Sequence, residues 1–269
     1  MRRRAASAAL VLAAGLTLAA CGGDDDKSSG ETKPDSSSSV TAGPSEALSA
    51  ETFLPTISAA QAKAGSSHVE MTVEAAGQQI TAEGDSLVSD DPSDSAMAMT
   101  MDLGDAVPGM SAMEIRLVDQ VFYINVGAMT ENKFAKIDLG DPDDPLAAQY
   151  GQLVEQMDPS RQIEQFKDSL SSFKQVGDAK TIDGVEATPY VLTLDAAKLQ
   201  GITGAPTAGM PESVEYTMYI GPDNLPRRIS SDIGGAALTM DYSKWGEDVD
   251  VKTPAADEIS ETDLSKQLG

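Results

Sequence analysis

After residue 65 the chain alternates between apolar and polar positions with a period of two. In residues 66–75, Val69, Met71 and Val73 fall on one side of an extended chain, and the residues between them are polar. The alternation is most regular in residues 94–103, where methionine occupies every second position from 97 to 101. Such alternation is typical of antiparallel strands with one solvated face and one dry face.

The apolar positions of these strands are predicted to share one continuous dry face. Besides the three residues above, its predicted members are Ile80, Met97, Met99, Met101, Met113, Ile115, Leu117, Phe122, Ile124, Val214, Tyr216 and Met218. Turns are predicted at Asp119-Gln120, at Asp183-Gly184 and at residues 221–224, because Gly, Asn and Asp accept the backbone angles of tight hairpins. With further strands at 133–139, 236–242 and 249–254, the total is about eleven strands.

Helical spacing appears before the first strand. In "TFLPTISAAQAKAG", residues 52–65, apolar residues recur every three or four positions. We expect a helix here, with Thr52 as its N-cap and Gly65 as its C-cap.

Helical spacing returns in the middle of the chain. Residues 146–157 carry one apolar stripe that includes Leu153, and residues 161–173 carry another that includes Phe166 and Leu170. Asp158-Pro159 should separate the two helices. A single stripe implies that each helix lies on an apolar surface. A further short helix is expected at residues 195–201.

The fold class follows from this order of elements. No repeat of fixed period and no internal linker interrupts the strands and helices. We therefore expect one α+β domain, built on an antiparallel sheet with helices packed on its dry face.

The N-terminus has the pattern of an export signal. Arginines at positions 2–4 precede a short apolar stretch, and Leu18-Ala19-Ala20-Cys21 resembles a bacterial lipobox. Residues 1–20 are accordingly expected to be a lipoprotein signal peptide, and Cys21 the lipidated residue that anchors the protein to a membrane. Residues 21–47 are rich in Ser, Asp and Gly and should form a disordered tether. The domain would then span residues 48–269.

Charge and cysteine content narrow the class of protein. The chain has 19 basic and 43 acidic residues, a net charge of −24, which becomes −27 once the arginines at positions 2–4 are removed. Such acidity argues against a nucleic-acid ligand and against direct docking on anionic lipid headgroups. Cys21 is the only cysteine, so the domain must fold without a disulfide bond.

Metal sites and enzymatic activity are poorly supported. Met97, Met99 and Met101 have the soft donors that Cu(I) prefers, but the other methionines are spread over several strands and the one histidine, His68, falls on the polar face. The acidic residues 141–145 lack the glycine and distal glutamate of an EF-hand. The chain has no G-x-S-x-G motif, and one histidine forms no recognisable triad. We expect no cofactor, no metal and no enzymatic activity.

Several segments, taken in order, resemble the LppX/LprG-type lipoproteins of mycobacteria and related actinobacteria. They are the lipobox, the Ser-rich tether, "AGSSHVEMTVE", "GQQITAEGDSLVSDDP", "GPDNLPRRI" and "LTMDYSKWGEDVDVKTPAADEI". The match covers most of residues 50–260, and its most specific part is the run with Trp245, Gly246, Val249 and Pro254. The resemblance implies a LolA-like half-barrel, with helices across its concave side and an apolar cavity for the acyl chains of a lipid or lipoglycan.

The sequence therefore predicts a membrane-anchored, monomeric lipid-binding lipoprotein of the cell envelope, which carries or presents its lipid, with an envelope transport protein as a possible partner. Cavity-lining residues would be the dry-face residues together with Leu153, Phe166 and Leu170. The helices at 146–157 and 161–173 are candidates for a movable lid. Two alternatives remain open: an envelope lipoprotein with a closed core, and a Cu(I)-binding lipoprotein rich in methionine.

Overall fold

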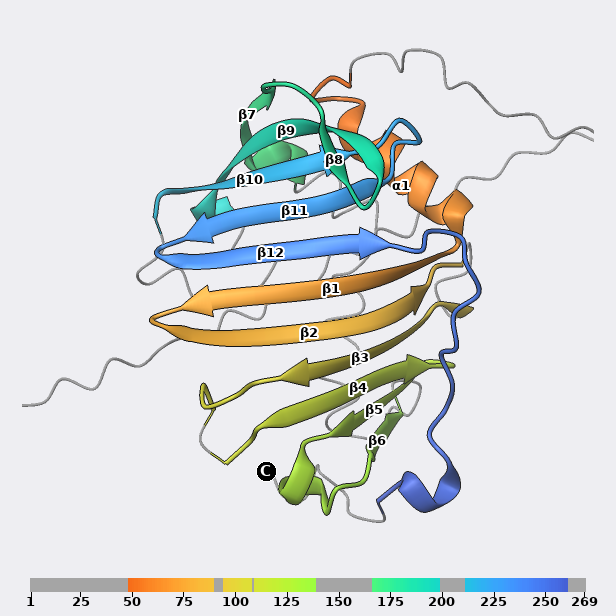
Figure 1. Ribbon diagram of the computed structural model, residues 1–269. Helices are drawn as coiled ribbons and strands as arrows, with labels where there is room; N and C mark the ends of the chain where they lie inside the picture. The colour runs from red at the N-terminus through yellow and green to blue at the C-terminus, as the bar shows by residue number, and fades with distance from the viewer. Residues whose placement is uncertain (1–47, 90–93, 108, 139–165, 199–210, 261–269) are drawn as a thin grey trace, which may run out of the picture.

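The computed structural model describes residues 48–89, 94–107, 109–138, 166–198 and 211–260. In this part of the chain twelve strands form one antiparallel sheet, in the order β6-β5-β4-β3-β2-β1-β12-β11-β10-β9-β7, and β8 pairs with β9 beside this path (Figure 1). The predicted antiparallel α+β architecture is confirmed, with twelve strands in place of about eleven. The sheet is open, because its outer strands β6 and β7 do not pair with each other, and it is curved (Figure 1).

Neighbours in the chain are mostly neighbours in the sheet. The strands are β1 (Ser66–Ala75), β2 (Gln78–Leu87), β3 (Ala96–Asp102), β4 (Ala112–Val118), β5 (Val121–Asn125), β6 (Ala135–Asp138), β7 (Leu170–Gln175), β8 (Lys180–Ile182), β9 (Val185–Asp195), β10 (Ser213–Ile220), β11 (Pro226–Ile233) and β12 (Ala236–Ser243). The helical elements are α1 (Phe53–Ala64) and two 3₁₀ turns, η2 (Gly127–Thr130) and η3 (Ala256–Glu258). The pairing of β1 with β12 joins the two halves of the sheet.

The predicted hairpin turns are confirmed by their backbone angles. Asp119 and Gln120 have φ values of 51° and 62°, and Asp183 and Gly184 have φ values of 47° and 75°. Positive φ at both central residues is the geometry that matches the twist of the flanking strands. In the turn at residues 221–224, Asn224 has a φ of 62°.

Gly84 marks a close approach of two strands in the curved sheet. A Cβ atom at this position would lie 2.2 Å from the carbonyl oxygen of Ala98 and 2.8 Å from the Cα atom of Met99, both in the backbone of β3. Only glycine permits this approach, and a glycine inside a strand commonly marks a sharp bend.

The helix α1 is confirmed, but its N-terminal cap differs from the prediction. Thr52 has helical backbone angles, with φ −93° and ψ −17°, and its side chain makes no cap hydrogen bond. The reciprocal bonds form one turn earlier: the Ser49 N–H donates to Thr52 Oγ1 (3.1 Å), and the Thr52 N–H donates to Ser49 Oγ (3.3 Å). The helix ends as predicted at Gly65, which has a φ of 77°.

The predicted helix at residues 161–173 is wrong at its C-terminal end. Residues 166–169 are helical, but Leu170–Gln175 form β7 and pair with β9. A register shift between Leu170 and Ser172 places Leu170 opposite Leu194 and Phe173 opposite Leu192. A bulge thus puts residues three apart on one face of a strand, which reproduces the apolar spacing of a helix.

The predicted strand at residues 249–254 is also wrong. Both neighbours of β12 are already occupied, by β1 and β11, so the chain leaves the sheet after Ser243. It passes the ends of the strands and reaches the β6 edge of the sheet (Figure 1). There the Phe134 N–H donates to the Glu258 carbonyl (2.7 Å), and the Ser260 N–H donates to the Phe134 carbonyl (2.7 Å). The C-terminal segment therefore covers part of the β6 edge.

Some predicted features lie outside the described residues. These are the signal peptide at 1–20, Cys21, the tether at 21–47, and the helix at 146–157 with Leu153. Of the short helix expected at residues 195–201, residues 196–198 are helical, and residues 199–201 lie outside the described residues. Within the described ranges no helix is long and apolar enough to span a membrane.

Candidate functional site

Five methionines from five strands line up across the sheet. In antiparallel strands, directly opposed residues point to the same face. The register places opposite one another, in succession, Met113, Met101, Ala82, Met71, Met240, Ile229, Met218 and Tyr190. We call Met113, Met101, Met71, Met240 and Met218 the methionine row. It runs perpendicular to the strands from β4 to β10.

The residues predicted to lie on the dry face are on the same face as this row. Val73 lies opposite Ile80, Met99 opposite Ile115, and Leu117 opposite both Met97 and Phe122. Ile124 faces Ile115, Tyr216 faces Leu192 and Val214 faces Leu194. Val69 lies two residues before Met71 on β1 and therefore faces the same side, where it is opposite Tyr242. One apolar face therefore extends over the sheet.

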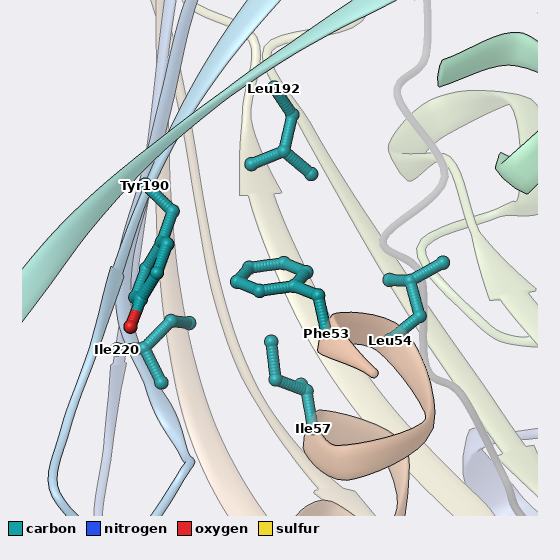
Figure 2. Close-up of a cluster of buried hydrophobic side chains, with 6 residues drawn as sticks. All are labelled: Phe53, Leu54, Ile57, Tyr190, Leu192 and Ile220. Carbon is teal, nitrogen blue, oxygen red and sulfur yellow. The ribbon is translucent and has the colours of Figure 1, made fainter. Parts of the chain in front are cut away.

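Helix α1 covers one end of this face. Phe53, Leu54 and Ile57 form a buried cluster with Tyr190, Leu192 and Ile220, and Figure 2 shows Phe53 pointing from the helix towards the strands. Phe53 is 1% exposed, and its ring lies 5.0 Å from that of Phe173 and 5.3 Å from that of Tyr190, centroid to centroid. Phe166 and Leu170 pack against the same cluster. This end of the face is a closed core.

The face is less covered on strands β1 to β5 than on β12, where Leu238, Met240 and Tyr242 form a buried cluster and are 6–7% exposed. Met101 is 4% exposed and Ile80 is 9% exposed, whereas Met71, Val73, Met99 and Ile115, which pack against them, are only half-buried. Val69, Met97, Leu117, Phe122 and Ile124 are half-buried as well. The sheet thus presents soft, partly accessible apolar side chains beside the fully buried cluster under α1.

The opposite face of the sheet is polar and carries several ion pairs. His68 Nδ1 lies 2.6 Å from Asp85 Oδ1, and the Arg228 guanidinium donates to both oxygens of Asp241 at 2.5 and 2.8 Å. The hydrogen bond to Asp241 raises the pKa of Arg228. His68 is therefore on the other side of the sheet from the methionine row and cannot join it in a copper site. The described residues contain no group of three or more His, Cys, Asp or Glu side chains that could hold a metal ion.

Polar side chains also lie on the apolar side, and one of them, Arg227, was missed by sequence reasoning. Burial raises the pKa values of Tyr216 and Tyr242 above the ordinary value of 10.0. Trp245 stacks on Tyr242 and donates from Nε1 to the Pro226 carbonyl (3.0 Å). Arg227 is 7% exposed. The sequence did contain a signal for Arg227. It is followed directly by Arg228 in a strand, and side chains of consecutive strand residues point to opposite faces, so one of the two arginines must face the dry side.

Solved structures with the same fold were found by comparison with this chain. No family model and no curated protein matches the chain. Among solved structures, the lipoprotein LppX of Mycobacterium tuberculosis superposes with a TM-score of 0.52 over 76% of this chain and 98% of LppX, at 17% sequence identity. The chain has the LppX fold. LprF of Mycobacterium bovis superposes with a TM-score of 0.51 over 77% of this chain and 97% of LprF, also at 17% identity.

The likeness to LppX and LprF confirms the predicted resemblance at the level of the fold. It covers nearly the whole of both proteins, so the curved sheet corresponds to their complete architecture and not to a fragment. Identity as low as 17% shows the fold alone. The ligand must therefore be argued from the side chains of this chain.

Proposed function

We propose that the protein is an envelope lipoprotein that binds the acyl chains of a lipid or lipoglycan on the concave, apolar face of its sheet. The observation that carries this proposal is the methionine row, together with the half-buried aliphatic residues on either side of it. Methionine is unbranched and polarizable, so it adapts to a flexible partner better than branched residues do. A closed core that needs one unique packing would use more leucine, isoleucine and phenylalanine.

The proposed mechanism is passive and needs no catalytic group. Each CH₂ group that leaves water contributes roughly 0.8 kcal/mol, so a chain of about 16 carbons gains roughly 12 kcal/mol before the cost of ordering it. The closed cluster under α1 supports one wall of the site, and the predicted helix at 146–157, with Leu153, would cover the chain from the other side. The fold of LppX and LprF is consistent with this arrangement.

Export and anchoring complete the proposal. Cleavage before Cys21 and lipidation of its sulfur would hold the protein at the outer face of the cell membrane, and residues 22–47 would lift the domain towards its lipid source. The protein would act as a monomer and pass its lipid to an envelope partner or present it. Cys21→Ala should move the protein from the membrane fraction to the soluble fraction, and retention of that variant on membranes would refute the anchor.

Native mass spectrometry tests the lipid-binding proposal most directly. The protein is purified under mild conditions from its own envelope, and the expected result is a population whose mass exceeds that of the polypeptide by that of a lipid. Met71→Gln should lower the lipid-bound fraction, because it puts an amide in the middle of the apolar face. Thr72→Gln is the matched control, since it introduces the same side chain one residue later on the polar face.

The outcome also decides between a carrier and a closed-core lipoprotein. A wild-type protein that appears only at its polypeptide mass refutes lipid binding and favours the closed core. A loss of lipid in both glutamine variants would show that the effect is not specific to the apolar face. Circular dichroism on both variants establishes that each is folded.

A further inference from the structure

Arg227 is a buried arginine beside the apolar face. A register shift in the pairing of β10 with β11 places Tyr219 opposite Arg228 and Ile220 opposite Pro226, so Arg227 is an extra residue without a partner on β10. Residues at a bulge are re-aimed relative to the regular alternation. The Arg227 side chain is 9% exposed, whereas that of Arg228, which pairs with Asp241 on the polar face, is 41% exposed. Adjacent arginines therefore lie in opposite environments.

The buried guanidinium pairs with a carboxylate but is only partly hydrogen-bonded. Its Nη2 donates to Asp223 Oδ2, but the Asp223 side chain is 45% exposed and its Oδ1 already accepts a hydrogen bond from the Leu225 N–H (3.1 Å). Nε and Nη1 of Arg227 are buried and have no hydrogen-bond partner among the described residues. A buried donor without a partner costs about 1–3 kcal/mol, and more when the group is charged.

The turn is shaped to let the guanidinium sit close to it. A Cβ atom on Gly221 would lie 3.3 Å from Arg227 Nη2, 3.4 Å from Nε and 2.6 Å from Asp223 Oδ1. Glycine at this position therefore leaves room for both the guanidinium and the carboxylate. The guanidinium is packed against the turn, and two of its nitrogens, Nε and Nη1, have no hydrogen-bond acceptor among the described residues.

The surroundings of Arg227 are those of an amphiphile site. Ile220, next to the turn, belongs to the cluster under α1, and Ile229, two residues along β11, lies within the methionine row between Met240 and Met218. An arginine whose planar donors are free matches the oxygens of a carboxylate or phosphate. An anion bound here would have its apolar part directed over the same face.

We propose that Arg227 binds the carboxylate or phosphate of an anionic amphiphile whose acyl chain lies on the apolar face. This inference rests on the proposed function and makes it more specific. It places the headgroup at the β10–β11 turn beside α1, and it makes the protein prefer acidic lipids even though its net charge is −24. The acidic surface then slows the approach of an anionic lipid, while the buried Arg227 guanidinium makes the binding site selective for it.

The test compares ligands that differ only in their head group. Dodecanoate and dodecanol are titrated into the purified full chain by calorimetry, and acetate and inorganic phosphate are titrated as anions without a chain. Wild-type protein should bind dodecanoate at least about tenfold more tightly than dodecanol, the size of effect expected for hydrogen bonds to a charged group. Acetate and phosphate should bind weakly, because they lack the apolar contribution.

Variants assign this preference to Arg227. Arg227→Gln should remove the preference for dodecanoate and leave dodecanol binding unchanged, whereas Arg227→Lys should keep part of it. Arg228→Gln is the matched control, because it removes an adjacent positive charge on the polar face and should leave the preference intact. Thermal unfolding of each variant without ligand separates loss of binding from loss of folding.

The outcomes separate this inference from the proposed function. Equal affinity of wild-type protein for dodecanoate and dodecanol would overturn the role of Arg227 and leave lipid binding standing. Failure to bind either compound would count against lipid binding itself. Tight binding of inorganic phosphate that Arg227→Gln abolishes would overturn the amphiphile in favour of a free anion. An equal loss of preference in Arg227→Gln and Arg228→Gln would show a general charge effect.

Discussion

Replacing Phe53 by alanine tests whether α1 is a fixed part of the core. The side chain is 1% exposed and contacts the rings of Phe173 and Tyr190 at centroid distances of 5.0 and 5.3 Å. Removing a buried phenylalanine costs about 3–5 kcal/mol through lost transfer energy and the cavity left behind. We expect a loss of about 4 kcal/mol, a large share of the 5–15 kcal/mol typical of a folded domain.

The size of the loss can be divided between burial and ring contacts. Phe53→Leu keeps an apolar side chain but loses two ring pairs, each of which contributes about 0.5–1.5 kcal/mol. It should therefore destabilise the domain by about 1–3 kcal/mol. Met129→Ala is the control, because Met129 is 53% exposed and a surface change is expected to stay within about 0.5 kcal/mol.

Urea unfolding followed by far-UV circular dichroism measures these free energies. The order of loss should be Phe53→Ala, then Phe53→Leu, then Met129→Ala. If Phe53→Ala lost less than about 1 kcal/mol, α1 would not be firmly docked on the sheet, and the helix itself would become the candidate lid. A large loss keeps α1 as a fixed wall of the lipid site.

Three further predictions follow from single residues. Burial raises the pKa of Tyr242 above its ordinary value of 10.0. The folded state therefore loses stability as pH rises above about 10, because the phenol ionises more readily in the unfolded chain. The melting temperature of Tyr242→Phe should fall less steeply in that range than that of the wild type. Gly84→Ala should destabilise the domain by about 1–3 kcal/mol in urea unfolding, since its Cβ would meet the Ala98 carbonyl at 2.2 Å. Met99→Ala should leave Cu(I) uptake unchanged in competition with a chelator, and a clear decrease would revive the copper alternative.

The strands and their faces could be read from the sequence because strand alternation is a local property. Val69, Met71 and Val73 repeat with period two whichever strand lies beside them, and Asp183-Gly184 forms a tight turn from its own backbone preferences. The predicted dry-face residues of the described strands lie on one face, but Tyr190, Leu192 and Ile229 of the same face were not predicted. What it binds was a matter of resemblance and remains a proposal.

Errors arose where pairing overrides local pattern. Leu170 and Phe173 are three residues apart, which reads as one helical turn, yet a bulge against β9 puts both on one face of a strand. Residues 249–254 alternate like a strand, but β12 already has a partner on each side. Neither the bulge nor the occupied edges leave a signal in the segment itself.

The sequence by itself determined which side chains face the dry side, where the hairpins turn, and that the domain folds without disulfide bonds. Only the tertiary structure decided which strands pair and in what register. That register places Met71 opposite Met240, which is far away in the chain, and Met101 opposite Met113. It also separates Arg227 from Arg228. The physical reason is that hydrogen bonds between distant strands fix the register, and a shift of one residue would turn every side chain to the other face.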